Sequence, residues 1–174
     1  YARMEHASEG GVYRTDDAGL TWRKMSSQNP RPMYFSQIRI DPTNDHRLYM
    51  LGVSLDISDD GGRTWIMNQS AIQSGIWPEG NAINASTHSD HHAFWINPQN
   101  PNHLLTGNDG GVSQSLDRGL TWRMFDNMDL GQFYHVGFDM DVPYRLYGGM
   151  QDNLSFGGPS ANRSYLGVSN DEWF

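Results

Sequence analysis

The chain has 174 residues, a net charge of −8 and no cysteine. This acidity argues against nucleic acid or an anionic membrane as a partner, and the missing cysteine excludes disulfide bonds and thiolate chemistry. No apolar run approaches the roughly 18 residues needed for a direct membrane span. The 19 glycines and 12% aromatic residues favour short strands and tight turns over helices.

An eight-residue pattern, Ser/Thr-x-Asp-x-Gly-x-Thr-Trp, occurs at 15–22, 58–65 and 115–122. Five fixed positions that recur three times in a short chain indicate an internal repeat. The copies start 43 and then 57 residues apart, close to the size of one four-stranded propeller blade. The repeat therefore predicts an all-β fold, a β-propeller segment of about three and a half four-stranded blades.

The residue types of the repeat are those of a tight turn between two strands. The Asp carboxylate accepts backbone N–H bonds from its own loop, and the Gly supplies a positive φ. Thr and Trp then begin the next strand. We expect a structural role for the Asp, Gly and Trp of each copy, which are Asp17, Gly19, Trp22, Asp60, Gly62, Trp65, Asp117, Gly119 and Trp122.

A Pro-bearing turn also recurs, at 39–44, 95–100 and 138–143. In chain order, the repeat copies and these Pro turns predict one partial blade, two whole blades and a second partial blade, all within one propeller domain over 1–174. The blades span 1–26, 33–69, 88–126 and 132–174. The second blade has strands expected near 34–40, 47–52, 54–58 and 64–68, and the third near 91–97, 103–107, 111–115 and 121–125. The fourth has strands near 134–140 and 145–150 and then loses the pattern.

The propeller is expected to be incomplete in this chain, because an arc of blades exposes strand edges. The chain begins at Tyr1 without an initiator Met or a signal-peptide pattern, so it is expected to come from a longer protein. The remainder of the propeller, or other protein chains, is therefore the expected partner.

The eight-residue pattern resembles the Asp-box, or bacterial neuraminidase repeat, of sialidases, xyloglucanase-type glycoside hydrolases and sortilin-type propellers. The stretches 88–98 with 107–112 and 130–134 with 147–153 resemble bacterial secreted proteins described as sortilin-like or glycosyl-hydrolase-like repeat proteins. The resemblance implies a bacterial, extracytoplasmic propeller: periplasmic, cell-surface or secreted. It does not fix the function, because this repeat occurs on enzymes and binding proteins alike. The sequence shows neither a sialidase-type arginine triad nor a match to the two xyloglucanase aspartates.

Strand direction alternates within a blade, so the loops divide between two faces. The Pro turns and the repeat turns share one face, while the turns between second and third strands share the other with the connections between blades. On the second face the carboxylates that a glycosidase would need are Asp90, Asp109 and Asp152. Candidate ligand contacts on that face are His91, His92, Asn108, Gln132, His135, Gln151, Asn153 and, as a stacking platform, Trp77.

Three interpretations of these polar residues stay open. The side chains satisfy one another, or bind a glycan or peptide, or hold a cation or act as acid–base groups. His91 and His92 point to opposite faces of a strand, so at most one of them joins a given site. We expect no metal and no cofactor; Asp-rich loops suit Ca²⁺, but no motif indicates it. The sequence favours a binding or structural scaffold for protein or glycan, with a glycoside hydrolase as the alternative.

Overall fold

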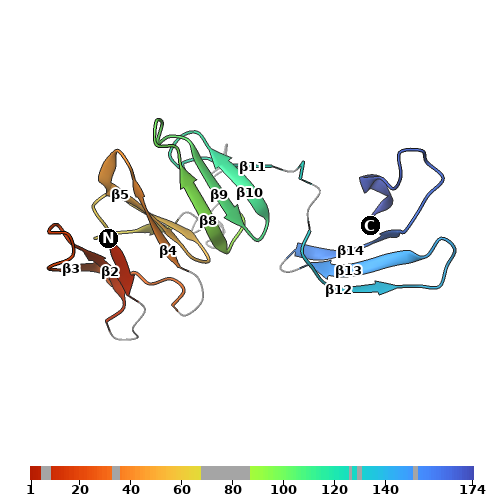
Figure 1. The fold of residues 1–174 in the computed structure, drawn as a ribbon, viewed down its shortest axis with the longest axis horizontal. Coiled ribbons are helices and arrows are strands. Elements are labelled where there is room, and N and C mark those ends of the chain that lie inside the picture. Colours follow the sequence, from red (N-terminus) through yellow and green to blue (C-terminus); the bar gives the residue numbers. More distant parts are fainter. Residues whose placement is uncertain (5–8, 33–35, 68–86, 126, 129–130, 151–152) are drawn as a thin grey trace, which may run out of the picture. The chain divides into compact units, whose positions relative to one another are not determined.

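The computed structural model describes residues 1–4, 9–32, 36–67, 87–125, 127–128, 131–150 and 153–174. The chain forms two compact units, Tyr1–Asp126 and Asn127–Phe174, and each is described by itself. In the described residues the fold is all-β in four small antiparallel sheets, with one short 3-10 turn (Figure 1). This architecture is compatible with a propeller fragment. None of the helices found in the described part has the length and apolarity needed to cross a membrane.

The first unit holds three sheets, and the strands of each follow one another in chain order. Sheet 1 contains β1 (Ala2–Met4), β2 (Gly11–Arg14) and β3 (Arg23–Ser26). Sheet 2 contains β4 (Gln37–Asp41), β5 (Asn44–Leu51), β6 (Leu55–Ser58) and β7 (Ile66–Met67). Sheet 3 contains β8 (His91–Ile96), β9 (Leu104–Asn108), β10 (Gly111–Ser115) and β11 (Arg123–Met124).

The three copies of the repeat form the same turn between the last two strands of these sheets; we call them repeat turns 1, 2 and 3. In repeat turn 2 the Asp60 carboxylate accepts the Thr64 amide at 2.9 Å and the Thr64 hydroxyl at 2.6 Å. The Ser58 hydroxyl accepts the Gly62 amide at 2.9 Å, and Gly62 has a φ of +84°. Repeat turns 1 and 3 repeat these bonds. The expected carboxylate and glycine contacts of the turn are therefore present. Thr and Trp, which were expected to begin the next strand, belong to the turn instead, because the next strands begin at Arg23, Ile66 and Arg123.

Hydrogen bonds in these turns keep the Asp carboxylates ionised. The Thr21 hydroxyl and amide, followed by Thr15, lower the pKa of Asp17 to about 2. Burial opposes ionisation of Asp117, but the bonds from Thr121 and its neighbours outweigh it and leave that pKa below its ordinary value. The carboxylate acceptors of the turn are thus charged at neutral pH. Hydrogen bonds to a charged acceptor are stronger than those to a neutral one.

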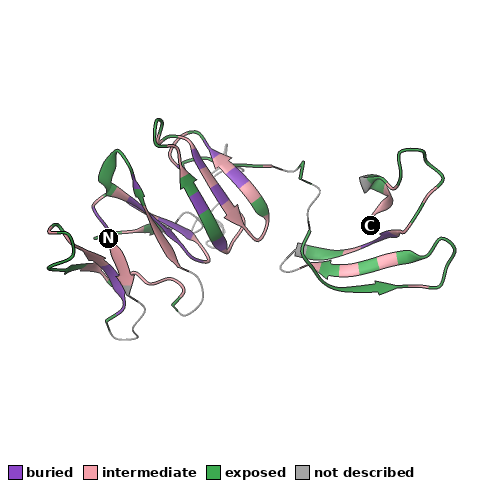
Figure 2. Ribbon diagram, in the orientation of Figure 1, coloured by how far each residue is buried: buried purple, intermediate pink, exposed green. Residues whose placement is uncertain are grey.

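A hydrophobic cluster of the first unit is shared by sheets 2 and 3, whose strands include the buried segments coloured purple in Figure 2. The rings of Tyr49 and Phe94 are 4.8 Å apart, and Trp122 meets Phe94 edge-on at 6.3 Å. Trp122 is only 3% exposed. In repeat turn 2 the indole N–H of Trp65 donates to the hydroxyl of Ser26 in sheet 1 at 3.0 Å. The tryptophan of a repeat turn therefore packs back onto the preceding sheet.

Contacts between sheets place the Pro turns and repeat turns on one face of the first unit, as predicted. The guanidinium of Arg118, in repeat turn 3, lies 3.1 Å from the buried carboxylate of Asp41 and donates to Thr43 at 3.3 Å. In repeat turn 2 the amide of Gly61 donates to the carbonyl of His46 at 2.9 Å. These contacts join the turn after β4 to repeat turn 3, and the start of β5 to repeat turn 2.

A fully buried carboxylate, Asp56 on β6, lies where sheet 2 meets the segment after sheet 1. Its two oxygens accept the Ser54 hydroxyl at 2.6 Å and the Gln28 amide at 2.5 Å. Burial raises the pKa of Asp56, against the hydrogen bonds from these neutral partners. Ionisation of Asp56 therefore lowers the free energy of unfolding.

We expect Asp56→Asn to become more stable relative to the natural chain as pH rises from 4 to 7. Above pH 3.8 the unfolded Asp56 ionises while the folded one resists, so the folded chain binds more protons and loses stability as pH rises. Each unit by which burial raises the pKa contributes about 1.4 kcal/mol to this difference. Urea unfolding at both pH values measures it, with the exposed Asp59→Asn as control. A difference that is the same at pH 4 and pH 7 contradicts the expectation.

The second unit holds sheet 4, with β12 (Phe133–Phe138), β13 (Arg145–Met150) and β14 (Asn153–Pro159), followed by the 3-10 turn η2 (Asn170–Glu172). The pattern was expected to end after the second strand, yet β14 pairs along β13. Phe174 and Gly157 then exchange two backbone hydrogen bonds of 2.8 Å. The end of the chain therefore returns to the place of a fourth strand, with Trp173 against Gly158.

Candidate functional site

The start of β8 contains a β-bulge that turns the two adjacent histidines in different directions. His91 pairs with Asn108 and Ala93 pairs with Gly107, so His92 is the extra residue of the bulge. The His91 side chain is completely buried, whereas the His92 side chain is 43% exposed. The two side chains therefore lie in different surroundings, and His92 is the one at the surface.

His91 is held between two hydroxyls in the interior. Its Nε2 lies 3.0 Å from Thr87 Oγ1 and its Nδ1 lies 2.8 Å from Thr106 Oγ1. Burial, followed by the neighbouring His88 and His92, lowers the pKa of His91 to about 4. The ring is therefore neutral at pH 7, and both of its nitrogens have partners. This position suits a packing role more than the ligand contact expected from the sequence.

The imidazole of His92 is fixed by Asp109 from the turn between β9 and β10. His92 Nε2 lies 3.1 Å from Asp109 Oδ1, and the Asp109 side chain is only 15% exposed. The His92 carbonyl accepts the Gln37 amide of sheet 2 at 3.0 Å, and the Asp109 amide donates to Ser89 O at 3.4 Å. An exposed imidazole is thus oriented by a partly covered carboxylate.

Asp90 lies directly before β8 in a left-handed backbone conformation, with a φ of +61°. Its amide donates to the Val53 carbonyl of sheet 2 at 3.0 Å. Its carboxylate forms an ion pair with Arg31 at 3.1 Å and accepts the Ser89 hydroxyl at 3.1 Å. The sequence did not single out Arg31, although its position in a Pro-Arg-Pro turn before sheet 2 was a usable signal.

Asn108 completes the polar cluster, the name we use for Asp90, His92, Asn108 and Asp109. Its Oδ1 accepts the Gly110 amide at 3.1 Å. Its buried Nδ2 has no hydrogen-bond partner in the described part of the chain. The cluster therefore combines an oriented imidazole, an amide donor and two carboxylates that already have partners. Nowhere in the described residues do three or more His, Asp or Glu side chains gather in a way that could hold a metal ion.

The other predicted contacts, apart from His91, lie in the second unit or outside the described residues. Gln132 and His135 are in the second unit, where His135 lines a hollow of sheet 4. Asn153 begins β14, but its side chain is outside the described set. Trp77, Gln151 and Asp152 lie outside the described residues. Of the three candidate carboxylates, the structure therefore brings two, Asp90 and Asp109, to the same end of sheet 3.

Comparison with known proteins gives no family-model match and no match among curated proteins. Among solved structures, the chain is similar to a GH74 xyloglucanase from Xanthomonas campestris, with a TM-score of 0.48 and 16% identity over 91% of this chain and 26% of that chain. It is also similar to an ancestral GH74 enzyme, with a TM-score of 0.34 and 14% identity over 96% of this chain and 28% of that chain. The chain thus spans little more than a quarter of their length.

Proposed function

We propose that this chain is an Asp-box propeller segment that acts as an extracytoplasmic, non-catalytic scaffold and binds a protein or glycan through the polar cluster. The observation that carries the proposal is the His92–Asp109 pair: an exposed imidazole held 3.1 Å from a carboxylate that is itself mostly covered. A side chain fixed in this way loses little conformational entropy when it binds a ligand. It suits the recognition of hydroxyl and carbonyl groups.

The arrangement of the carboxylates favours binding over hydrolysis. A glycosidase uses two carboxyl groups on either side of the bond to be broken, one as acid and one as base or nucleophile. Here Asp90 forms an ion pair with Arg31, and Asp109 holds His92. Both carboxylates thus serve to orient cationic or imidazole groups. The cluster offers a ligand the exposed imidazole of His92.

The full chain, tested on glycan and peptide arrays, is expected to bind a ligand that His92→Ala and Asp109→Asn weaken about tenfold or more. That loss corresponds to one well-placed hydrogen bond to a charged or oriented group. His46→Ala is a matched control, because His46 is exposed and 3.8 Å from Asp45 but lies on the repeat-turn side. It should leave binding unchanged.

Two results would contradict the scaffold proposal. Equal binding by all three variants would remove the polar cluster from recognition. Hydrolysis of a polysaccharide panel that is abolished by Asp109→Asn, with the circular dichroism spectrum intact, would establish the glycoside hydrolase instead.

A further inference from the structure

Some strand positions that are buried in sheets 2 and 3 have counterparts in sheet 1 that carry different side chains. Strand pairing aligns three pairs, Ala2 with Tyr13 in sheet 1, Met50 with Asp56 in sheet 2 and Thr106 with Ser113 in sheet 3. Each second member precedes the Ser or Thr of its repeat turn by two residues. These pairs and the repeat-turn tryptophans therefore occupy equivalent positions on one face of each sheet.

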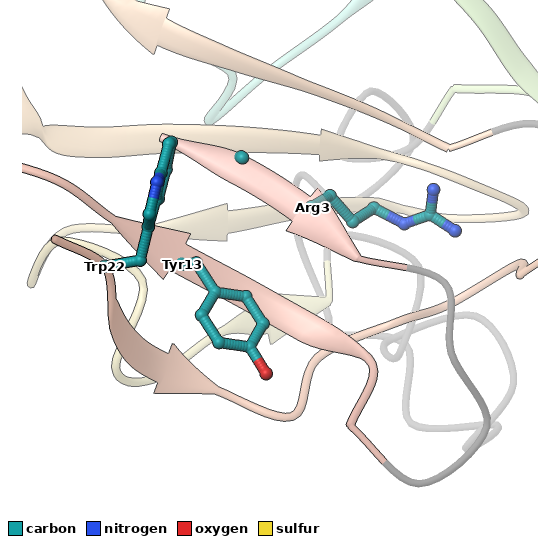
Figure 3. Close-up of a pocket in the computed structure, with 4 residues that line it drawn as sticks. Arg3, Tyr13 and Trp22 are labelled. Carbon is teal, nitrogen blue, oxygen red and sulfur yellow. The ribbon is translucent and has the colours of Figure 1, made fainter. Parts of the chain in front are cut away.

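This face is covered in sheets 2 and 3 but open in sheet 1. Met50, Asp56, Thr106, Ser113 and Trp122 are at most 3% exposed. Trp22, by contrast, is 48% exposed. With Ala2, Arg3 and Tyr13 it lines a cleft of about 320 Å³, shown in Figure 3. We call this surface of sheet 1 the Trp22 face.

The first unit shows what covers the equivalent faces. Trp122 packs in one cluster with Tyr49, Leu51 and Leu55 of the preceding sheet. An added Cβ on Gly62 of repeat turn 2 would lie 3.2 Å from Val12 of sheet 1. In both cases the cover is the neighbouring antiparallel sheet, contributed by its middle strands. The Trp22 face continues this established sheet-on-sheet interface, so another sheet of the same kind fits it.

Sheet 4 presents a face of the kind that gives such cover. The Leu-Tyr pairs 48–49 and 146–147 align β13 with β5, and this places the pair Tyr147–Gly157 at the position of Tyr49–Ile57. In sheet 2 that face receives sheet 3. In sheet 4 it is a hollow of about 610 Å³ between Tyr147, Phe174 and His135, with a floor that includes Gly137, Gly149 and Gly157.

We infer that copies of this chain associate head to tail, with the Trp22 face of one copy docked into the glycine-floored hollow of sheet 4 in another. Trp22 is half exposed beside Tyr13, and the glycines in the floor of the hollow leave room for such bulky rings. Burying an aromatic side chain removes about 150–250 Å² from water. The contact is heterologous, because the two copies use different surfaces. The inference is independent of the proposed function, because neither surface contains the polar cluster.

Sedimentation velocity of the full chain over a wide concentration range tests this association. Ala2→Arg and Ser155→Arg each place a long cationic side chain in one of the two surfaces. Each variant alone should weaken self-association at least about tenfold. An equimolar mixture of the two should form a one-to-one dimer, because each variant keeps the surface that the other has lost. Leu20→Arg, exposed in repeat turn 1 outside both surfaces, should associate like the natural chain.

A natural chain that stays monomeric at every concentration would overturn the inference. So would association that both variants leave unchanged, or a mixture of variants that stays monomeric. Circular dichroism checks that each variant folds, and oxidative labelling read by mass spectrometry adds a readout on the natural chain. Labelling of Trp22 should fall as association proceeds; unchanged labelling in an oligomer would place the contact elsewhere.

Discussion

Trp122→Ala is expected to lower the free energy of unfolding of sheets 2 and 3 by about 3–5 kcal/mol, the range for a buried Trp replaced by Ala. Trp122 is 3% exposed and packs with Phe94 and with Tyr49, Leu51 and Leu55 of the neighbouring sheet. Its loss opens a cavity in the cluster that the two sheets share. Hydrogen exchange of the β8–β10 amides, read at low protein concentration, measures the change.

Trp22→Ala is the matched control, since Trp22 occupies the same position of the repeat but is 48% exposed. Its indole N–H donates only within its own turn, to Gly19 O at 3.1 Å. We expect a loss of no more than about 1.5 kcal/mol in the monomer. Equal losses for the two variants would show that the motif stabilises its own turn and that packing on the preceding sheet adds nothing.

Asp60→Ala is expected to lower the free energy of unfolding of sheet 2 by about 2–3 kcal/mol, the range for losing hydrogen bonds to a charged group. The carboxylate accepts the Ser58 hydroxyl, the Arg63 amide, and the Thr64 amide and hydroxyl. Without the carboxylate, these hydroxyl and amide donors can form hydrogen bonds only with water. Asp59→Ala, which removes only a surface ion pair with Arg47, should cost about 1 kcal/mol or less.

The effect of Asp60→Ala should also depend on pH. The hydroxyl and amide of Thr64 hold the pKa of Asp60 well below its ordinary value of 3.8. Because the folded pKa is lowered, the stabilisation is complete above pH 3.8 and declines as pH falls below it. The natural chain and the variant should therefore converge in acid. A difference that stays constant from pH 7 to below pH 3 would contradict this account of the turn.

The sequence predicted the repeat turns and the strands of sheets 2 and 3 because these depend on local chemistry. A carboxylate, a glycine and a Thr-Trp pair produce the same bonds in each copy, whatever surrounds them. Burial is different, because it depends on what packs against the motif: Trp22 and Trp122 share a sequence position and differ in exposure. β14 was missed because Ser155, Gly157 and Gly158 give no alternation of apolar and polar residues.

The candidate site was predictable in outline only. The sequence placed Asp90, His92 and Asp109 at one end of a sheet, and strand alternation separated His91 from His92. It did not predict the bulge that brings His92 to Asp109, because a bulge arises from pairing between strands rather than from the residues of one strand. Nor did it predict Arg31 as the partner of Asp90, since the two are 59 residues apart.

The central claim is that the tryptophans of repeat turns 2 and 3 pack on the sheet before them. A nuclear Overhauser spectrum of the full chain tests this most directly. We predict cross-peaks from the Trp122 ring to Tyr49 and Leu55, and from the Trp65 indole N–H to Ser26. Cross-peaks from these tryptophans to their own sheets alone would contradict the account.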